Sequence, residues 1–163
     1  MEFNKSKKIL VIGRAGMDIY PEPPGTKISE VKNFSTHLGG SAANTCVALC
    51  QLGVQSDLLT CVSEDAIGEY IFEKLREFNV GSNLCRRVEN KFQTQVAVVE
   101  TILKNNQSIL YRNNSCDLQL NKNDIDNINF QDYSAVFISG TALSSNPSRD
   151  AVFYATQKAS SLS

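Results

Sequence analysis

Short apolar runs that end at glycine or at polar turns recur along the chain. Residues 8–12 and 135–139 are runs of this kind, and Gly13 and Gly140 follow them directly. Continuous apolar runs of this length are typical of strands that are buried on both faces of a parallel sheet. Residues 57–62 form a third such run. Because apolar residues recur at helical spacing between these runs, the pattern predicts an α/β protein built from βαβ units.

Two long helices are predicted between these strands. The first begins at Ser41 and is closed by Gly53, and it is apolar on nearly every face. We therefore expect it to be buried on two sides. The second begins after the polar residues 63–65, which can cap a helix, and continues through apolar positions at helical spacing. Further helices are predicted to begin near residue 121 and at Pro147.

The middle of the chain has a β-rich pattern instead. Residues 94–102 and 108–112 flank a polar turn, and together they predict a β-hairpin. The proline-rich stretch 21–25 breaks regular structure, and residues 27–34 alternate only loosely. We expect the hairpin and this earlier excursion to form a separate small sheet that projects from the α/β layers.

Composition narrows the functional classes. The chain has 163 residues, with 16 Lys and Arg against 17 Asp and Glu. This length suits one domain, and the balanced charge gives no electrostatic reason to expect nucleic acid or an anionic membrane as partner. No apolar run approaches the ~20 residues that span a bilayer. The basic N-terminus precedes too short an apolar run for a signal peptide, so we expect an exposed tail there.

The cysteines do not predict a metal site. Five cysteines include no Cys-x-x-Cys pair, and His37 is the only histidine. A structural zinc site needs four closely spaced ligands, so we expect no metal site. Reduced, mostly buried thiols in a cytosolic protein explain the pattern better.

Two stretches combine glycine with polar side chains. Gly39 and Gly40 allow close approach of the backbone, and Asn44 lies in the first turn of the following helix, where free N–H groups gather. Asp18 follows the first strand, at the end where open α/β sheets bind ligands, although a solvated loop aspartate explains it equally well. Residues 13–16 do not form Gly-x-Gly-x-x-Gly, which disfavours a dinucleotide-binding oxidoreductase.

Five segments carry a resemblance to a known family: residues 12–22, 37–44, 61–68, 109–113 and 139–141. On these segments the chain resembles the N-terminal part of a ribokinase/PfkB-family carbohydrate kinase. The Gly-Gly-x-x-x-Asn segment is fairly specific for the family. The Arg-Ala-Gly-Met-Asp-Ile-Tyr-Pro stretch points to the subgroup of myo-inositol catabolism, whose substrates are keto-deoxy sugar acids such as 5-dehydro-2-deoxygluconate. The resemblance implies a ribokinase-like three-layer α/β/α sandwich with a small β-sheet lid, here the N-terminal part only, with lid segments at approximately 19–37 and 92–114.

The resemblance also implies a sugar site. Asp18 would hydrogen-bond to sugar hydroxyls, and Gly39, Gly40 and Asn44 would line the same site. Arg112 would face the acidic end of the substrate, since a guanidinium matches two carboxylate oxygens. A salt bridge at the rim of the sheet is the alternative interpretation of Arg112.

The family's second signature, Gly-Ala-Gly-Asp, occurs nowhere in the 163 residues. In such kinases it supplies the general base and the anion hole for phosphoryl transfer. The resemblance therefore implies ATP and Mg²⁺ for an intact enzyme, but no catalytic residue, no tightly bound cofactor and no activity for this chain alone. The expected ligand is a small sugar or sugar acid, and a homodimer through the lid is one expected assembly. The alternative is a non-catalytic sugar-binding or dimerisation module.

Overall fold

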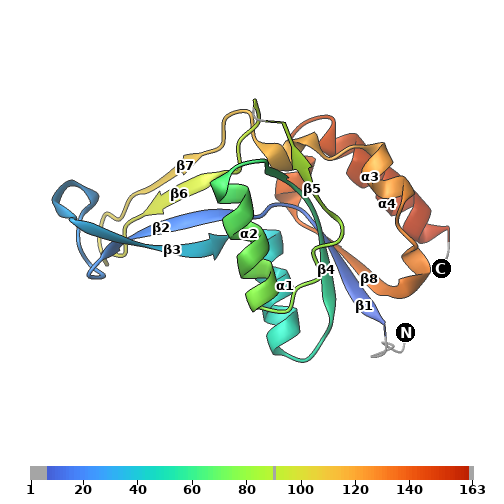
Figure 1. Cartoon of the computed structure of the whole chain (residues 1–163), viewed down its shortest axis with the longest axis horizontal. Helices are drawn as coiled ribbons and strands as arrows, with labels where there is room; N and C mark the ends of the chain where they lie inside the picture. Colours follow the sequence, from blue (N-terminus) through green and yellow to red (C-terminus); the bar gives the residue numbers. More distant parts are fainter. Residues whose placement is uncertain (1–6, 90, 162–163) are drawn as a thin grey trace.

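The computed structural model describes residues 7–89 and 91–161, which form two separate four-stranded sheets (Figure 1). The first sheet is parallel throughout and has the strand order β5-β4-β1-β8. Its strands are β1 (Lys8–Ile12), β4 (Ser56–Ser63), β5 (Cys85–Val88) and β8 (Tyr133–Ile138). The expected N-terminal tail lies largely outside the described residues.

Helices cover both faces of this sheet. One face packs against α1 (Ser41–Gln51) and α2 (Ala66–Glu77), and the other against α3 (Lys122–Asp126) and α4 (Ser148–Ser160). Successive side chains of a strand point to opposite faces, so β1 contributes to both cores. Ile9 and Val11 pack with α1 and α2, whereas Leu10 and Ile12 pack with the α3 and α4 side. The predicted three-layer α/β/α arrangement is therefore confirmed.

The second sheet projects from one end of these layers (Figure 1). Its order is β3-β2-β6-β7. Its strands are β2 (Gly16–Glu22), β3 (Asn33–Gly39), β6 (Val96–Val99) and β7 (Ser108–Tyr111). The β6–β7 pair is antiparallel, as predicted for a hairpin, and β2 joins it to β3. The predicted separate sheet is confirmed, and its use as a lid stays a prediction.

The loosely alternating residues 27–34 are only partly strand. They include a short 3-10 helix, Ile28–Glu30, and the first two residues of β3. The strand extends further than the pattern indicates, because all seven of its residues pair with β2 in one continuous register from Asn33 to Gly39. Tertiary pairing thus decides the strand where local alternation is weak.

Two burial predictions are wrong. Helix α1 is not buried on two sides, because Asn44 and Ala48 are exposed along one face. Strand β8 is not buried on both faces either, since it is an edge strand and Phe137 is 44% exposed. An apolar run predicts that a surface can be buried, but it does not predict whether another element of the same chain packs against that surface. The last helix begins at Ser148, one residue after Pro147.

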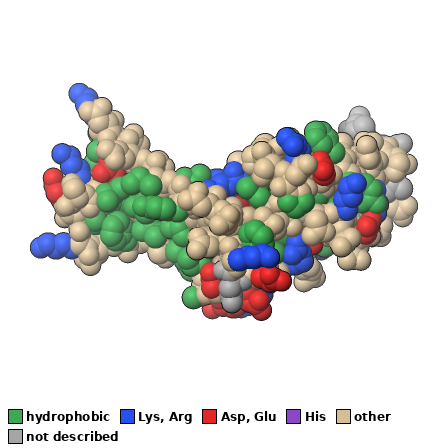
Figure 2. All heavy atoms as spheres, turned by 90° about the horizontal axis from the view of Figure 1, so that it is seen from above, with side chains coloured by type: hydrophobic (Ala, Val, Ile, Leu, Met, Phe, Trp, Pro, Cys, Tyr) green, Lys and Arg blue, Asp and Glu red, His purple; other side chains and the backbone are tan. Residues whose placement is uncertain are grey.

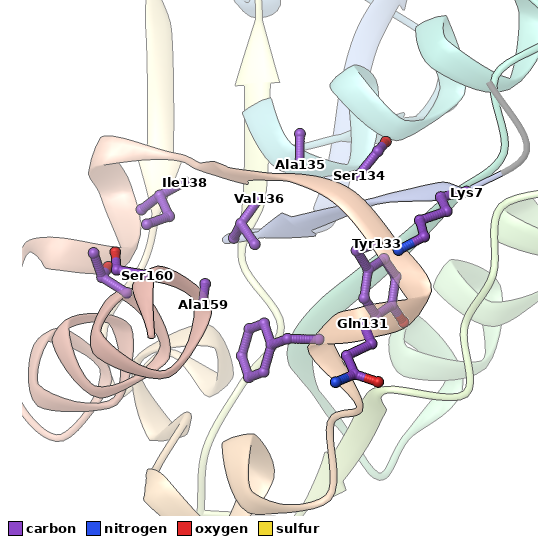
Figure 3. A pocket seen from close by; sticks show the side chains of 11 residues that line it. Lys7, Gln131, Tyr133, Ser134, Ala135, Val136, Ile138, Ala159 and Ser160 are labelled. Atoms are coloured by element: carbon purple, nitrogen blue, oxygen red, sulfur yellow. The ribbon is translucent and has the colours of Figure 1, made fainter. Parts of the chain in front are cut away.

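A groove of about 440 Å³ runs between β8 and α4 (Figure 3). Val136 and Ile138 line it from the strand, Ala159 from α4, and Phe130 from the segment before β8. The strand edge at this groove has no β-partner in the described part of the chain. Within residues 7–89 and 91–161, no helix has the length and apolar character that crossing a bilayer requires.

Candidate functional site

Asp18 lies within a strand of the second sheet, so the solvated-loop interpretation is wrong. It is a half-buried residue of β2, opposite His37 of β3 and Ala97 of β6. The backbone of Gly39 passes directly beneath its carboxylate. A Cβ at residue 39 would lie 2.1 Å from an Asp18 oxygen, closer than any van der Waals contact allows. A glycine at residue 39 therefore leaves room for the Asp18 side chain.

Gly40 makes a second close approach, to the connection between β1 and β2. A Cβ at Gly40 would lie 2.4 Å from the carbonyl oxygen of Arg14. The φ angle of Gly40 is 95°, a conformation that glycine adopts without strain. The amide of Ala43 in the first turn of α1 also donates to the Arg14 carbonyl, at 3.3 Å. The glycine pair thus places the start of α1 against both Arg14 and the Asp18 carboxylate.

The Asp18 carboxyl is in a partly desolvated, polar environment. Burial raises its pKa above the ordinary value, although Arg14, His37 and the Tyr20 hydroxyl act in the opposite direction. The rings of Tyr20 and His37 meet edge to face, with centroids 5.4 Å apart. These side chains alternate along β2 and β3 onto one face of the sheet, which gives that face a cluster of hydrogen-bonding groups.

Arg112 connects the second sheet to the α/β layers. It follows β7 directly, and its Nη2 donates to Asp117 at 2.6 Å and to the carbonyl oxygen of Thr141 at 3.1 Å. Asp117 also accepts a hydrogen bond from Ser115. The structure therefore contains the ion pair of the alternative interpretation, although it is largely buried, with the side chains of Arg112 and Asp117 18% and 4% exposed.

Two further polar side chains near this site, those of Arg14 and Gln95, were not predicted as site residues. Arg14 makes no side-chain hydrogen bond or ion pair with any described residue. Its Nε is buried without a partner, and so are the Nε of Arg112 and both amide atoms of Gln95. Burial, followed by the nearby charge of Arg112, lowers the pKa of Arg14. Arg14 lies between Gly13 and Asp18 in the sequence, and its closeness to Asp18 is the feature that could have identified it as a site residue.

Asn44 is the predicted site residue that the structure connects least well. It is exposed on α1, and its backbone N–H donates to the carbonyl oxygen of Gly40 at 2.9 Å. Its side-chain amide makes no hydrogen bond within the described ranges. The structure therefore brings Asp18, Gly39 and Gly40 together, places Arg14 and Arg112 within electrostatic range, and leaves Asn44 on the helix surface beside them.

Three buried thiols are poorly suited to act as nucleophiles. Burial raises the pKa of Cys46, Cys61 and Cys116 to about 12, so these thiols stay protonated at neutral pH and are poor nucleophiles. Across residues 7–89 and 91–161, no cluster of three or more His, Cys, Asp or Glu side chains is arranged to hold a metal ion.

Comparison with known proteins gives consistent results. Residues 6–162 match the family described as pfkB family carbohydrate kinase. The chain is 34% identical to the 5-dehydro-2-deoxygluconokinase of Clostridium perfringens strain 13, over 98% of this chain and 48% of that protein. It is also 34% identical to the Photobacterium profundum protein of the same name, over 92% of this chain and 45% of the relative. The chain thus spans about half the length of these curated relatives.

Solved structures agree on the fold. An uncharacterized sugar kinase from Pyrococcus horikoshii superposes with a TM-score of 0.80 at 29% identity, covering 92% of this chain and 50% of the other. A fructokinase from Xylella fastidiosa superposes with a TM-score of 0.83 at 22% identity, covering 95% of this chain and 49% of the fructokinase. The second similarity concerns the fold alone.

Proposed function

The chain belongs to the pfkB family of carbohydrate kinases, and from that premise we propose that it forms the sugar-binding half of such a kinase. We propose a keto-deoxy sugar acid, of the kind named in 5-dehydro-2-deoxygluconokinase, as the substrate class. The observation that carries this proposal is the Asp18 carboxylate seated over Gly39. A half-buried carboxylate with open acceptor positions is suited to bind and orient sugar hydroxyls.

The remaining residues have distinct roles in this proposal. Gly39 and Gly40 let the backbone pass close to the sugar, and Asn44 adds an amide at the start of α1. Arg112 binds the acidic end of the substrate, for which its guanidinium has the matching geometry. The second sheet acts as a lid that covers the bound sugar and excludes water. Because Arg112 already contacts Asp117 and Thr141, substrate binding at this residue would couple the lid to the α/β layers.

Phosphoryl transfer needs groups that this half does not supply. ATP provides the transferred phosphoryl group in such kinases and Mg²⁺ offsets its charge, and we assign neither to the described residues. We propose that the nucleotide-binding half docks on β8, where the strand edge is open and an apolar groove runs beside it (Figure 3). Parallel sheets are usually covered on both faces, and an edge strand with exposed apolar side chains is commonly covered by another element.

The test is a phosphoryl-transfer assay on the purified chain with ATP, Mg²⁺ and 5-dehydro-2-deoxygluconate. We expect no transfer by the chain alone. We expect transfer to appear when the C-terminal half of a pfkB kinase is added as a second polypeptide. Transfer by residues 1–163 alone would refute the division of roles between the two halves.

A second role, as a dimerisation module, is favoured by one observation. The face of the second sheet opposite Asp18 is apolar and exposed, and Figure 2 shows apolar side chains gathered over this part of the molecule. Phe34, Ile109 and Tyr111 on that face are 47%, 39% and 60% exposed. We propose that a second copy of the chain covers this face. Sedimentation should then show a dimer that Ile109→Lys converts to a monomer.

A further inference from the structure

We propose that Arg14 is a second residue that binds the substrate carboxylate, together with Arg112. Arg14 follows β1 and precedes Asp18 by four positions, and its backbone is fixed by Gly40 and by the amide of Ala43. The proposal rests on the proposed function, because it assigns the acid specificity of the same sugar site to a particular side chain.

The charge on Arg14 has no protein counterpart at hydrogen-bond distance. In the described part of the chain, no carboxylate lies within 4.0 Å of its guanidinium, and its Nε is buried without an acceptor. A partly buried guanidinium whose Nε has no acceptor is costly, so a polar ligand at this position is expected. Arginine prefers carboxylate or phosphate groups, which can accept two parallel N–H bonds.

Neither of the two nearby carboxylates forms an ion pair with Arg14. Asp117 accepts hydrogen bonds from Arg112 and from Ser115. Asp18 attracts Arg14 electrostatically but makes no ion pair with it. The charge of Arg112 is therefore compensated by direct contact with Asp117, whereas the charge of Arg14 is not. A ligand carboxylate would compensate the charge on Arg14.

Gln95 is independent evidence that a polar ligand belongs here. Its side chain is 1% exposed, yet both of its amide atoms lack a partner. The side chain lies against Gly16, where a Cβ would be 2.2 Å from its Nε2. Gly16 and Asp18 are two positions apart in β2, so Gln95 lies on the Asp18 face of the sheet. The Val96–Tyr111 register, extended by one position, places Gln95 opposite Arg112.

These positions indicate how the site would distinguish substrates. The Asp18 end has hydrogen-bond acceptors for hydroxyl groups, and the Arg14 and Arg112 end has positive charge and the unpartnered Gln95 amide. A neutral sugar satisfies the first end only, whereas a sugar acid satisfies both. Removing Arg14 should therefore reduce the preference for the acid without reducing the affinity for neutral sugars.

Calorimetry on the full chain tests this inference with two ligands, 5-dehydro-2-deoxygluconate and the neutral ketose fructose. Arg14→Met should weaken binding of the acid by roughly tenfold or more and change fructose binding by less than about twofold. Arg14→Lys keeps the positive charge but lacks the planar guanidinium, so it should weaken binding of the acid less than Arg14→Met does. Arg149→Met is the matched control and should change neither affinity, since Arg149 is an exposed arginine whose guanidinium bonds to Asn146.

The outcomes separate the two proposals. If Arg14→Met and Arg14→Lys fold normally and bind the acid as tightly as the wild-type chain, the role of Arg14 is refuted while the sugar site stands. An equal loss for both ligands would also refute it, since a structural role does not discriminate charge. If the wild-type chain binds neither ligand, the sugar site itself fails and the Arg14 proposal fails with it.

Discussion

At the scale of single residues, the site depends on the absence of two side chains. Because Gly39 has no side chain, the Asp18 carboxylate can lie against it. Gly40 likewise lets the Arg14 carbonyl group approach its Cα. The sequence could identify Asp18 and the glycine pair as candidates, because glycines before a helix and an aspartate after a strand are recognisable patterns. It could not show that Asp18 and Gly39 touch, because that contact depends on the antiparallel pairing of β2 with β3.

Gly39→Ala should therefore displace Asp18 from the site. The added Cβ would lie 2.1 Å from a carboxylate oxygen, so the side chain must rotate away or the strands must separate. We expect sugar-acid binding to be lost and the free energy of unfolding to fall by about 1–3 kcal/mol, the usual cost of overpacking. Calorimetry and denaturant unfolding measure the two effects. Gly140→Ala is the matched control, because nothing lies within 4 Å of its Cβ position.

Asp18 should also leave a signature in the pH dependence of stability. Its pKa is raised in the folded chain, mainly by burial, so the folded state binds this proton more tightly than the unfolded state. The contribution of Asp18 to stability is thus complete below its unfolded pKa and is lost as pH rises through its folded pKa. Asp18→Asn, which does not titrate, should gain stability relative to wild type over that pH range. A constant difference between the two proteins across the range would contradict the raised pKa.

At the scale of secondary structure, the apolar runs and caps predicted most elements because they act locally. Strands β1 and β4, helix α2 and the β6–β7 hairpin lie where the pattern placed them. The capping box at Asn121 likewise begins α3 as predicted. The burial of α1 and β8 could not be predicted in the same way, since it depends on which surfaces another element covers.

The start of α2 provides a quantitative test at this scale. Asp65 accepts hydrogen bonds from the amides of Ile67 and Gly68, at 3.0 and 2.9 Å. Burial by itself raises the pKa of Asp65, but these bonds and one from Ser63 outweigh it, so the net pKa is lowered. Asp65→Ala should reduce the free energy of unfolding at pH 7 by about 1 kcal/mol.

The pH dependence of that loss follows from the same hydrogen bonds. A lowered folded pKa means that the stabilisation is present above the unfolded pKa and is lost as pH falls through the folded pKa. The difference between wild type and Asp65→Ala should therefore shrink in acid. Asp150→Ala, in the first turn of α4 but without a side-chain cap, is the control and should cost less than about 0.5 kcal/mol. An equal loss in both variants would contradict the capping role.

At the scale of the whole molecule, the chain has a core on each face of the parallel sheet and an open edge at β8. Its motifs identified the family, and its length relative to the curated relatives agrees with one half of such a protein. The proposed docking surface at β8 could not be predicted from the sequence. The apolar residues 135–139 look the same whether the chain or another polypeptide covers them.

Phe137→Lys tests whether β8 is a docking surface. Phe137 is 44% exposed, so its replacement should change the free energy of unfolding of this chain by less than about 0.5 kcal/mol. The same variant should abolish the phosphoryl transfer that an added C-terminal half restores. Leu52→Lys, at the far end of α1 and 80% exposed, is the control and should leave restoration intact. Restoration that is equally strong with Phe137→Lys would place the docking surface elsewhere.

The central claim is that a sugar acid binds between Asp18 of the second sheet and the guanidinium groups of Arg14 and Arg112. An amide NMR titration of the ¹⁵N-labelled chain with 5-dehydro-2-deoxygluconate tests it most directly, because weak binding to half a site remains visible. We predict saturating shifts at Gly16, Gly39 and Gly40 that disappear in Gly39→Ala. Shifts confined to the β8 groove, or none at millimolar ligand, would contradict the account.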